Sequence, residues 1–337
     1  MQFLHNASLK EYNTFGIDVS ARRFISVTNV EDLKEVLAQT YSSELFILGG
    51  GSNMLLTKDI EKTVLHIDLK GKELISENEN EVLVKASAGE NWHEFVLYTL
   101  EKGLGGLENL SLIPGKVGTA PIQNIGAYGV ELKDVFEECE AIHIQTLEQK
   151  TFSKEACKFD YRNSVFKNKL KGQYIITSVT FRLTKNHHVL HTDYGAIKNA
   201  LDQKGIKDAG VKEISDAVIS IRKSKLPDPR ILGNSGSFFK NPVISVDLFE
   251  ELQRAYPEMP SYTVSPQEVK IPAGWLIEKA GLKGYRKGDA GVHKNQALVL
   301  VNYGTATGME ILQLSQKVQE KVEEKFQIKL EPEVNII

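Results

Sequence analysis

The segment Ser111–Gly129, SLIPGKVGTAPIQNIGAYG, constrains the fold more than any other part of the chain. Its nineteen residues include four glycines and two prolines, yet they are too apolar for a solvated linker. A long irregular segment that is buried leaves many backbone groups unpaired unless a polar ligand binds them. A pyrophosphate, a ribose or an isoalloxazine edge would serve, so the segment predicts a bound nucleotide cofactor. A hydrophobic Ω-loop is the alternative.

A second glycine-rich turn, LGGGSN at Leu48–Asn53, suits the same kind of ligand. Backbone N–H groups can approach phosphate oxygens closely there, because no side chain obstructs them. Gly49 and Gly51 fit the first two glycines of the G-x-G-x-x-G fingerprint, but Met54 occupies its last position, and the chain has no P-loop string. A plain tight turn is the alternative interpretation.

Composition narrows the class of partner. The 337 residues are enough for two domains or for one large elaborated domain, and 41 basic against 44 acidic residues give a net charge of -3. A chain with this charge lacks the excess of basic residues that binds nucleic acid or an anionic membrane, so we expect small-molecule ligands. The N-terminus lacks the features of a signal peptide and no apolar run could cross a bilayer, so we expect a cytoplasmic protein.

Cysteine and histidine patterns give no sign of a metal. Cys139 and Cys157 lack metal or redox spacing, which favours a reducing compartment and leaves a single intramolecular disulfide open. His187, His188 and His191 have no accompanying cysteine or carboxylate pattern, so they indicate a polar surface loop. We therefore predict no metal.

Local patterns predict an α+β protein in two lobes. Capping boxes at Thr28–Glu31 and Thr307–Glu310 should begin helices. Further helices are expected over 91–102, around 214–221 and over 275–280. Strands are expected over 45–48, 63–67, 81–88, 174–183 and 297–301, and over 328–337, where EPE interrupts the last one.

Four polar residues in three segments have unusual sequence neighbours. Ser237 lies in GNSGSFFKNP between a glycine and two phenylalanines, where a turn entering a buried strand is the simple explanation. Arg162 lies among aromatics in CKFDYRNSVFK, where its stem could pack on the rings or its fork could bind a carboxylate. Glu331 and Glu333 flank Pro332 in an apolar strand, and the proline leaves their relative facing open.

These strings together resemble the bacterial UDP-N-acetylenolpyruvoylglucosamine reductase family. The resemblance runs from NTFGI at Asn13 to LEPEV at Leu330–Val334, in the family's order and spacing. HTDYGAIKNAL is similar to the tyrosine-bearing loop of the family's longer class. The resemblance implies an FAD-binding module of the vanillyl-alcohol-oxidase type with two α+β lobes, plus a separate α+β substrate-binding domain.

The resemblance also implies a division of the chain. We expect an FAD-binding module over 1–200, with lobes of about 1–68 and 69–184 and an inserted tyrosine loop of about 185–200. The substrate-binding domain should cover 201–337, and its terminal strand should return to the active site. A monomer is expected.

The implied activity is reduction of UDP-N-acetylglucosamine enolpyruvate to UDP-N-acetylmuramate for peptidoglycan synthesis. FAD would be bound without a covalent link, and NADPH would be the hydride donor. Ser237 matches the family's proton donor, and Arg162 and Glu333 match its other catalytic positions. We interpret Glu333 as protonated or arginine-paired, because a bare carboxylate would repel the substrate's carboxylate.

Further residues match the family's binding positions. Tyr194 and Lys225 would bind the diphosphate, Asn241 and Gln296 would lie nearby, and Tyr161 is a weaker candidate. The positions expected to contact FAD are Gly49, Gly50, Gly51, Ser52, Asn53, Met54, Ser111, Ile113, Pro114, Gly115, Gly118, Thr119, Ala120, Pro121, Gln123, Asn124, Gly126, Ala127, Tyr128 and Gly129.

Two other functions compete with this one. An oxidase on the same flavin module would pass electrons to oxygen, but such enzymes often attach flavin through histidine or cysteine, and the glycine-rich loops contain neither. A catalytically silent sugar-nucleotide sensor would have lost Ser237, Arg162 or Glu333, and all three are present.

Overall fold

The computed structural model describes residues 2–337 and mixes helices with strands, which confirms the predicted α+β class. It divides into two compact units, each made of several stretches of chain. Unit 1 comprises the described part of Met1–Ala7, Ala21–Gly50 and Ile60–Ser224, and unit 2 comprises Ser8–Ser20, Gly51–Asp59 and Lys225–Ile337. Compactness does not test which part binds which ligand, so the predicted division at residue 200 stays a prediction.

The first sheet of unit 1 is largely parallel. Its order is β1 (Leu4–Ser8), β2 (Ser20–Val27), β5 (Ile60–Ile67) and β3 (Leu45–Leu48), and β5 is parallel to both β2 and β3. The last five residues of β5 are buried, as expected of a central parallel strand.

Helix α1 (Val30–Gln39) packs on this sheet through Leu33, Val36 and Leu37. The capping box predicted at Thr28–Glu31 is wrong by one residue. Asn29 is the N-cap, because its extended backbone lets the side-chain oxygen accept the amide hydrogen of Asp32 at 2.7 Å.

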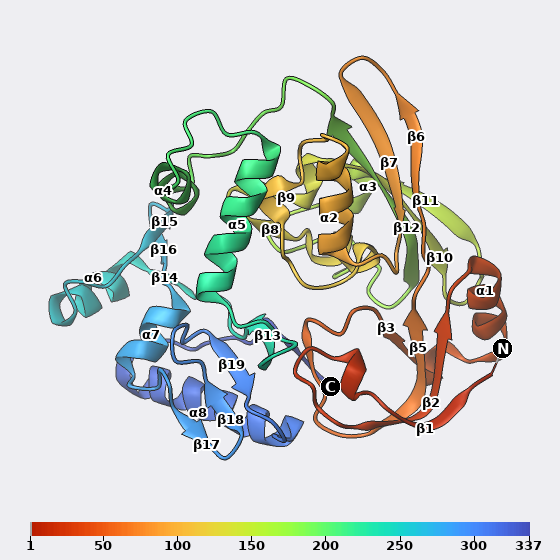
Figure 1. Cartoon of the computed structure of the whole chain (residues 1–337). Helices are drawn as coiled ribbons and strands as arrows, with labels where there is room; N and C mark the ends of the chain where they lie inside the picture. The colour runs from red at the N-terminus through yellow and green to blue at the C-terminus, as the bar shows by residue number, and fades with distance from the viewer. Residues whose placement is uncertain (1) are drawn as a thin grey trace. The chain divides into compact units, whose positions relative to one another are not determined.

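The second sheet of unit 1 is antiparallel. Its order is β11 (Gln149–Ser153), β10 (Phe136–His143), β12 (Tyr174–Thr184), β7 (Glu81–Ser87) and β6 (Lys72–Glu77). Helix α2 (Trp92–Glu101), which Asn91 caps, lies against it (Figure 1). Trp92 and Phe95 pack edge-on or tilted against Phe181 of β12, so α2 and the sheet share one core. The predicted α2, β7 and β12 are confirmed.

Two further helices and several short elements complete unit 1. Helices α4 (Gly195–Gln203) and α5 (Val211–Lys225) pack together through Ile197, Leu201, Ile214 and Val218. The predicted tyrosine loop of about 185–200 is therefore a loop only as far as Tyr194. The others are α3 (Lys154–Cys157), β8 (Gly126–Ala127), β9 (Val130–Glu131), η2 (Ser42–Glu44), η3 (Glu108–Leu110), η4 (Val117–Thr119), η5 (Pro121–Gln123) and η6 (Leu132–Asp134).

Unit 2 has an antiparallel sheet covered by helices. The sheet's order is β13 (Gly233–Ser237), β19 (Val299–Asn302), β18 (Ala290–Val292) and β17 (Arg286–Lys287). Helix α8 (Gly308–Phe326) packs on β18, β19 and α7 (Ala273–Lys279). Its predicted capping box is confirmed, since Thr307 and Glu310 bond each other's backbone amides. The remaining elements are β14 (Val243–Ser245), β16 (Glu268–Lys270), β15 (Tyr262–Ser265), α6 (Val246–Ala255) and η1 (Lys10–Tyr12).

The C-terminal segment departs from its prediction. Instead of one strand over 328–337, only β20 (Asn335–Ile336) forms, parallel to β4 (Met54–Leu55). Before it, Pro332 makes an isolated antiparallel bridge with Phe239, in which the bonds run from Lys240 N to Glu331 O and from Glu333 N to Phe238 O. Proline fits this position because the pair needs no N–H from it.

Cys139 and Cys157 are both buried and carry free thiols. Among residues 2–337, no helix is long and apolar enough to cross a membrane.

Candidate active site

Two glycine-rich segments meet in unit 1. A Cβ atom on Gly50 would come within 3.1 Å of Gly115 Cα, and one on Gly49 would come within 2.6 Å of Thr119 Cγ2. On the other side of the loop, a Cβ on Gly118 would meet Ala88 Cβ at 2.4 Å. A side chain at any of these three positions would force its neighbours to shift, so glycine allows the backbone at Gly50 to pack closely against that at Gly115.

Backbone hydrogen bonds fix the first half of the long loop. Gly115 O accepts from Trp92 N at 3.1 Å, while Val117 N donates to Glu90 O and Gly118 N to Ala88 O, both at 2.9 Å. The segment 115–118 therefore lies along the stretch that joins β7 to α2. The backbone N–H and C=O groups of this irregular loop are thereby hydrogen-bonded, as they would be at the edge of a sheet.

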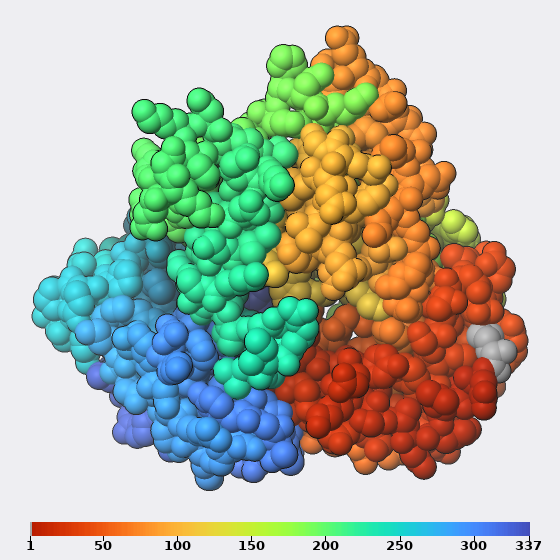
Figure 2. Space-filling model, in the orientation of Figure 1, coloured from red at the N-terminus to blue at the C-terminus, as the bar shows by residue number. Residues whose placement is uncertain are grey.

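The rest of the loop is held by side chains and by left-handed residues. Leu112, Asn124 and Tyr128 have φ of 58°, 43° and 52°. Ser111 Oγ lies 2.7 Å from Ser215 Oγ of α5, and Leu112 N donates to Nδ1 of His93 at 3.0 Å. The loop is thus an ordered structure between α2 and α5, whose surfaces adjoin in Figure 2.

Arg162 lies beside this loop. Asn124 Nδ2 donates to Asp160 O at 3.1 Å, and Ser164 Oγ donates to Ile122 O at 2.7 Å, so the turn 160–164 is fastened to residues 122–124. Arg162 itself is half-buried with φ of 52°, and Tyr161 is 65% exposed. Left-handed backbone at a non-glycine residue is uncommon and often occurs at functional sites.

Arg222 of α5 was not among the predicted site residues. Its Nε donates to Leu112 O at 3.2 Å, and its guanidinium bonds the side chain of Tyr128. Burial lowers the pKa of Arg222, and the nearby charge of Arg162 lowers it further. Two guanidinium groups close together attract an anion. In the sequence, Arg222 lies three residues before Lys225 in the string IRKSKLP. That string indicates only a helix with a basic end, so it did not identify Arg222 as a site residue.

Tyr194 joins the same cluster. Its ring lies edge-on to that of Tyr128, with centroids 5.3 Å apart, and it is 54% exposed. Asn109 Nδ2 donates to both Tyr128 O at 3.1 Å and His191 O at 2.9 Å. The structure therefore brings Tyr128, Tyr194, Arg162 and Arg222 together in unit 1.

Ser237 ends strand β13 in unit 2. The preceding Gly236 has φ of 69°, and its amide donates to Asn234 Oδ1 at 2.9 Å. Ser237 is exposed, while Phe238 and Phe239 are at most 1% exposed. The phenylalanines anchor the turn in the core and leave the hydroxyl at the surface of the unit.

Glu333 is a direct neighbour of this turn, since its amide donates to Phe238 O at 2.8 Å. Glu333 is half-buried. Glu331 differs, because it is exposed and its carboxylate forms an ion pair with Lys240 at 2.9 Å. The two glutamates around Pro332 thus have separate environments, and Glu333 is the one beside Ser237.

The second half of the glycine turn also lies in unit 2. A Cβ on Gly51, whose φ is 60°, would come within 2.0 Å of Tyr12 O. Asn53 Nδ2 lies 3.4 Å from Glu333 O, and Met54 O accepts from Ser235 Oγ at 3.3 Å. Gly51–Met54 therefore borders the segments that carry Ser237 and Glu333.

Asn241 and Gln296 meet at the start of α7. Asn241 Oδ1 accepts from Ala273 N at 2.9 Å, and Gln296 Oε1 lies 3.1 Å from where a Cβ on Gly274 would be. Lys225 is the exposed last residue of α5. Of the three loop histidines, His188 bonds Thr184 Oγ1 through Nδ1 at 2.6 Å.

The chemistry of the glycine segments fits FAD. Gly49, Gly50, Gly115 and Gly118 present backbone without side chains, which suits a pyrophosphate, and Thr119 adds a polar group on the same loop, whereas Ser111 and Asn124 are fully buried and bonded within the protein. The glycines and Thr119 would hold the cofactor.

Comparisons with known proteins agree with this assignment. The FAD binding domain family matches residues 21–146, and the family described as UDP-N-acetylenolpyruvoylglucosamine reductase, C-terminal domain, matches residues 228–337. The reductase of that name from Flavobacterium johnsoniae is 59% identical over 337 residues, covering 100% of both chains. The one from Pseudomonas aeruginosa strain PAO1 is 46% identical, covering 100% of this chain and 99% of its own.

A solved structure supports the fold. The UDP-N-acetylenolpyruvylglucosamine reductase from Thermus caldophilus superimposes with a TM-score of 0.69 at 24% identity, covering 99% of this chain and 98% of its own.

Proposed function

Because the chain belongs to the UDP-N-acetylenolpyruvoylglucosamine reductase family, we propose that it reduces UDP-N-acetylglucosamine enolpyruvate to UDP-N-acetylmuramate. The observation that carries the proposal is the 59% identity to a reductase of that name over the whole of both chains. The product serves peptidoglycan synthesis, and through it cell-wall formation, cell shape and division. We place the protein in the cytoplasm, as a monomer.

FAD, bound without a covalent link and reduced by NADPH, would supply the hydride for the methylene carbon of the enolpyruvyl group. The two glycine-rich segments would hold this cofactor, because bare backbone allows a pyrophosphate to approach closely. NADPH and the sugar nucleotide bind in turn.

Ser237 delivers the proton. Once the methylene carbon has gained hydride, negative charge develops on the carbon next to the carboxylate, which becomes basic enough to take a proton from a hydroxyl. The Ser237 O–H bond breaks as the new C–H bond forms, and water restores the hydroxyl. The buried phenylalanines fix the turn, so the proton reaches one face only and sets the D-lactyl centre.

Arg162 binds the substrate carboxylate and stabilises the charge that spreads onto it. Arg222 contributes a second guanidinium beside Arg162. Glu333 polarises the enolpyruvyl group in a protonated or arginine-paired form, since a bare carboxylate there would be repulsive. Finding Glu333 ionised and away from bound substrate would contradict that role.

The remaining residues bind the sugar nucleotide. Tyr194 and Lys225 bind the diphosphate, Asn241 and Gln296 contribute amide groups, and Tyr161 makes an outer contact. The loop 185–194 closes over the diphosphate, so its amide hydrogen exchange should slow when the substrate binds.

An anaerobic half-reaction tests the function. Purified enzyme is reduced with NADPH, the enolpyruvyl substrate is added, and flavin absorbance is followed. We expect rapid reoxidation by wild type and a rate lowered by about 10²–10⁴-fold in Ser237→Ala, the usual range for loss of a general acid. Reduction by NADPH should stay normal in that variant, and Ser237→Cys, which keeps an acidic proton, should retain more activity.

Two results would refute the proposal. A flavin that stays reduced until air enters would identify an oxidase, the alternative function. Equal rates of reoxidation in wild type and Ser237→Ala would remove Ser237 from the chemistry.

A further inference from the structure

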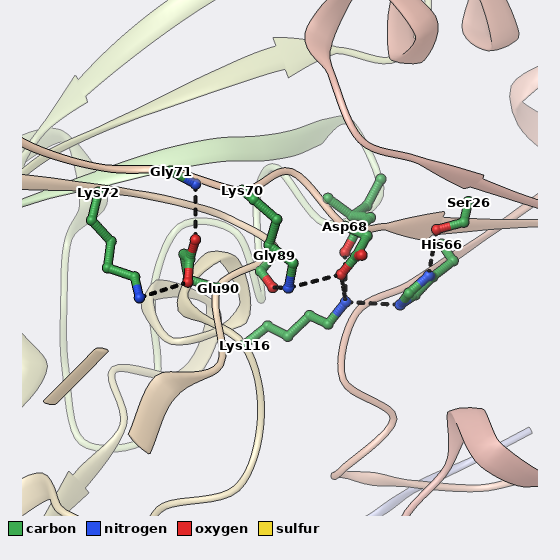
Figure 3. Close-up of polar contacts among 10 residues, drawn as sticks. Ser26, His66, Asp68, Lys70, Gly71, Lys72, Gly89, Glu90 and Lys116 are labelled. Atoms are coloured by element: carbon green, nitrogen blue, oxygen red, sulfur yellow. Dashed lines mark hydrogen bonds and ion pairs between the residues drawn. The ribbon is translucent and has the colours of Figure 1, made fainter. Parts of the chain in front are cut away.

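A partly buried polar network links the long glycine-rich loop to the end of strand β5 (Figure 3). Lys116 Nζ lies 2.8 Å from His66 Nε2, 3.0 Å from Ile67 O and 2.8 Å from Asp68 Oδ1. His66 Nδ1 in turn lies 2.8 Å from Ser26 Oγ of β2. All of these residues belong to unit 1.

The number of N–H donors on lysine determines which atom donates in each of these hydrogen bonds. A lysine ammonium has three N–H donors and no acceptor, so three acceptors use all of them. His66 Nε2 must then accept from Lys116, and its proton resides on Nδ1, which donates to Ser26 Oγ. The side chain of Lys116 is therefore fully engaged inside the protein, although the residue stands between Gly115 and Val117 of the cofactor loop.

The network ties together the two sheets of unit 1. On one side, the loop is bonded along residues 88–92, which follow strand β7 of the antiparallel sheet. On the other side, Lys116 reaches His66–Asp68 at the end of β5 in the largely parallel sheet. Lys70 adds a second cation to Asp68 at 3.0 Å and donates to Gly89 O.

We propose that Lys116 is a positioning residue, which anchors the cofactor loop to the end of β5 and so fixes Gly115 against Gly50 for FAD. It acts through Asp68 and His66 rather than by bonding the pyrophosphate. This inference rests on the proposed function only for the identity of the cofactor, because the contacts within unit 1 carry the rest.

The alternative is that Lys116 is a phosphate ligand, as a lysine in a glycine-rich loop often is. Asp68→Asn distinguishes the two roles of Lys116, because they predict changes of FAD affinity in opposite directions. If Lys116 anchors the loop, neutralising Asp68 weakens the anchor and FAD affinity falls. If Lys116 binds phosphate, neutralising its internal partner frees the ammonium and FAD affinity stays or rises.

The experiment measures FAD release from purified holoprotein by equilibrium ultrafiltration at decreasing protein concentration. The variants are Lys116→Met, Asp68→Asn and the double variant, and the control is Lys133→Met. Lys133 is also ion-paired, with Glu131 at 2.6 Å, but it makes no contact with β5 among the described contacts. Hydrogen exchange of residues 112–120 is followed in parallel.

We expect each single variant to weaken FAD binding about tenfold, which corresponds to about 1.4 kcal/mol. The double variant should be little worse than either, because both changes break one anchor. Exchange at 112–120 should accelerate, and the salt dependence of the FAD dissociation constant should not change, because no contact with phosphate is lost. Lys133→Met should match wild type in all three readouts.

Asp68→Asn binding FAD as tightly as wild type or more tightly would overturn the proposal, as would a flatter salt dependence in Lys116→Met. If Lys116→Met does not fold, the direction in which the milder Asp68→Asn variant changes FAD affinity still distinguishes the two roles. Wild type without FAD would overturn both this proposal and the proposed function. Wild type that binds FAD but leaves the enolpyruvyl substrate unreduced would overturn the proposed function alone.

Discussion

His66 should make the stability of unit 1 strongly dependent on pH. Burial, followed by the charge of Lys116, lowers the pKa of His66 from 6.5 to about 4 in the folded protein, while the charge of Asp68 acts to raise it and that of Lys70 to lower it. Between these two values the unfolded chain binds a proton that the folded chain does not. Stability is therefore complete above pH 6.5 and is lost as the pH falls towards 4.

The magnitude follows from the two pKa values. A shift of about 2.5 units corresponds to about 3 kcal/mol at the acid limit, and about 2 kcal/mol of this is already lost at pH 5. His66 is only 8% exposed, so solvent screening does little to reduce the effect.

The assay is urea unfolding at pH 8 and at pH 5, with FAD held at a fixed concentration. The chain has two tryptophans, Trp92 in unit 1 and Trp275 in unit 2. In a Trp275→Phe background, fluorescence reports unit 1 alone. His66→Gln keeps a neutral donor and acceptor at all pH values, so wild type should lose about 2 kcal/mol more than this variant.

His187→Gln is the control, because His187 is exposed. It should show the pH dependence of wild type, and the contributions of other groups, such as the half-buried His93, cancel in the comparison. A difference below about 0.5 kcal/mol between wild type and His66→Gln would refute the reasoning, since His66 would then carry a proton beside Lys116.

Two further predictions concern stability and thiol access. Thr307→Ala removes the hydroxyl that accepts from Glu310 N at 3.2 Å, so the free energy of unfolding of unit 2 should fall by about 1 kcal/mol. Urea unfolding followed by the fluorescence of Trp275 measures this change, and Thr307→Ser should restore the stability. An unchanged unfolding midpoint in the alanine variant would contradict the capping role of Thr307. The thiol of Cys157 against Cys139, together with burial, raises the pKa of Cys139, so neither thiol should react with a disulfide reagent until the protein unfolds. Fast labelling of native protein would contradict this burial.

Much of the fold could be predicted because its signals are local. Helices α2 and α8 carry their own caps and apolar faces, and β12 is an apolar run that fills the centre of its sheet. The prediction of one terminal strand over 328–337 was wrong because strand formation there depends on distant partners. Its alternation was present in the sequence, but among residues 2–337 its backbone pairs as a strand only with Phe239 and with β4.

The site could be predicted in part. The two glycine-rich segments were recognisable because close packing of backbone requires glycine, whatever the partner. Arg222 was missed because a basic helix end usually faces solvent, and its contact with Tyr128 depends on a loop far away in sequence. The network of Ser26, His66, Asp68 and Lys116 gave no signal, since each residue alone is ordinary and ninety positions separate the first from the last.

The pairing of β20 with β4 bears on how the protein is made. Unit 2 requires Ser8–Ser20 and Gly51–Asp59, which leave the ribosome early, and it also requires the last residues of the chain. At about 5–20 residues per second, roughly 14–56 s pass between synthesis of Met54–Leu55 and synthesis of Asn335–Ile336. During that time Met54 and Leu55 lack the strand with which they pair, so unit 2 completes its fold only after Asn335–Ile336 have been synthesised.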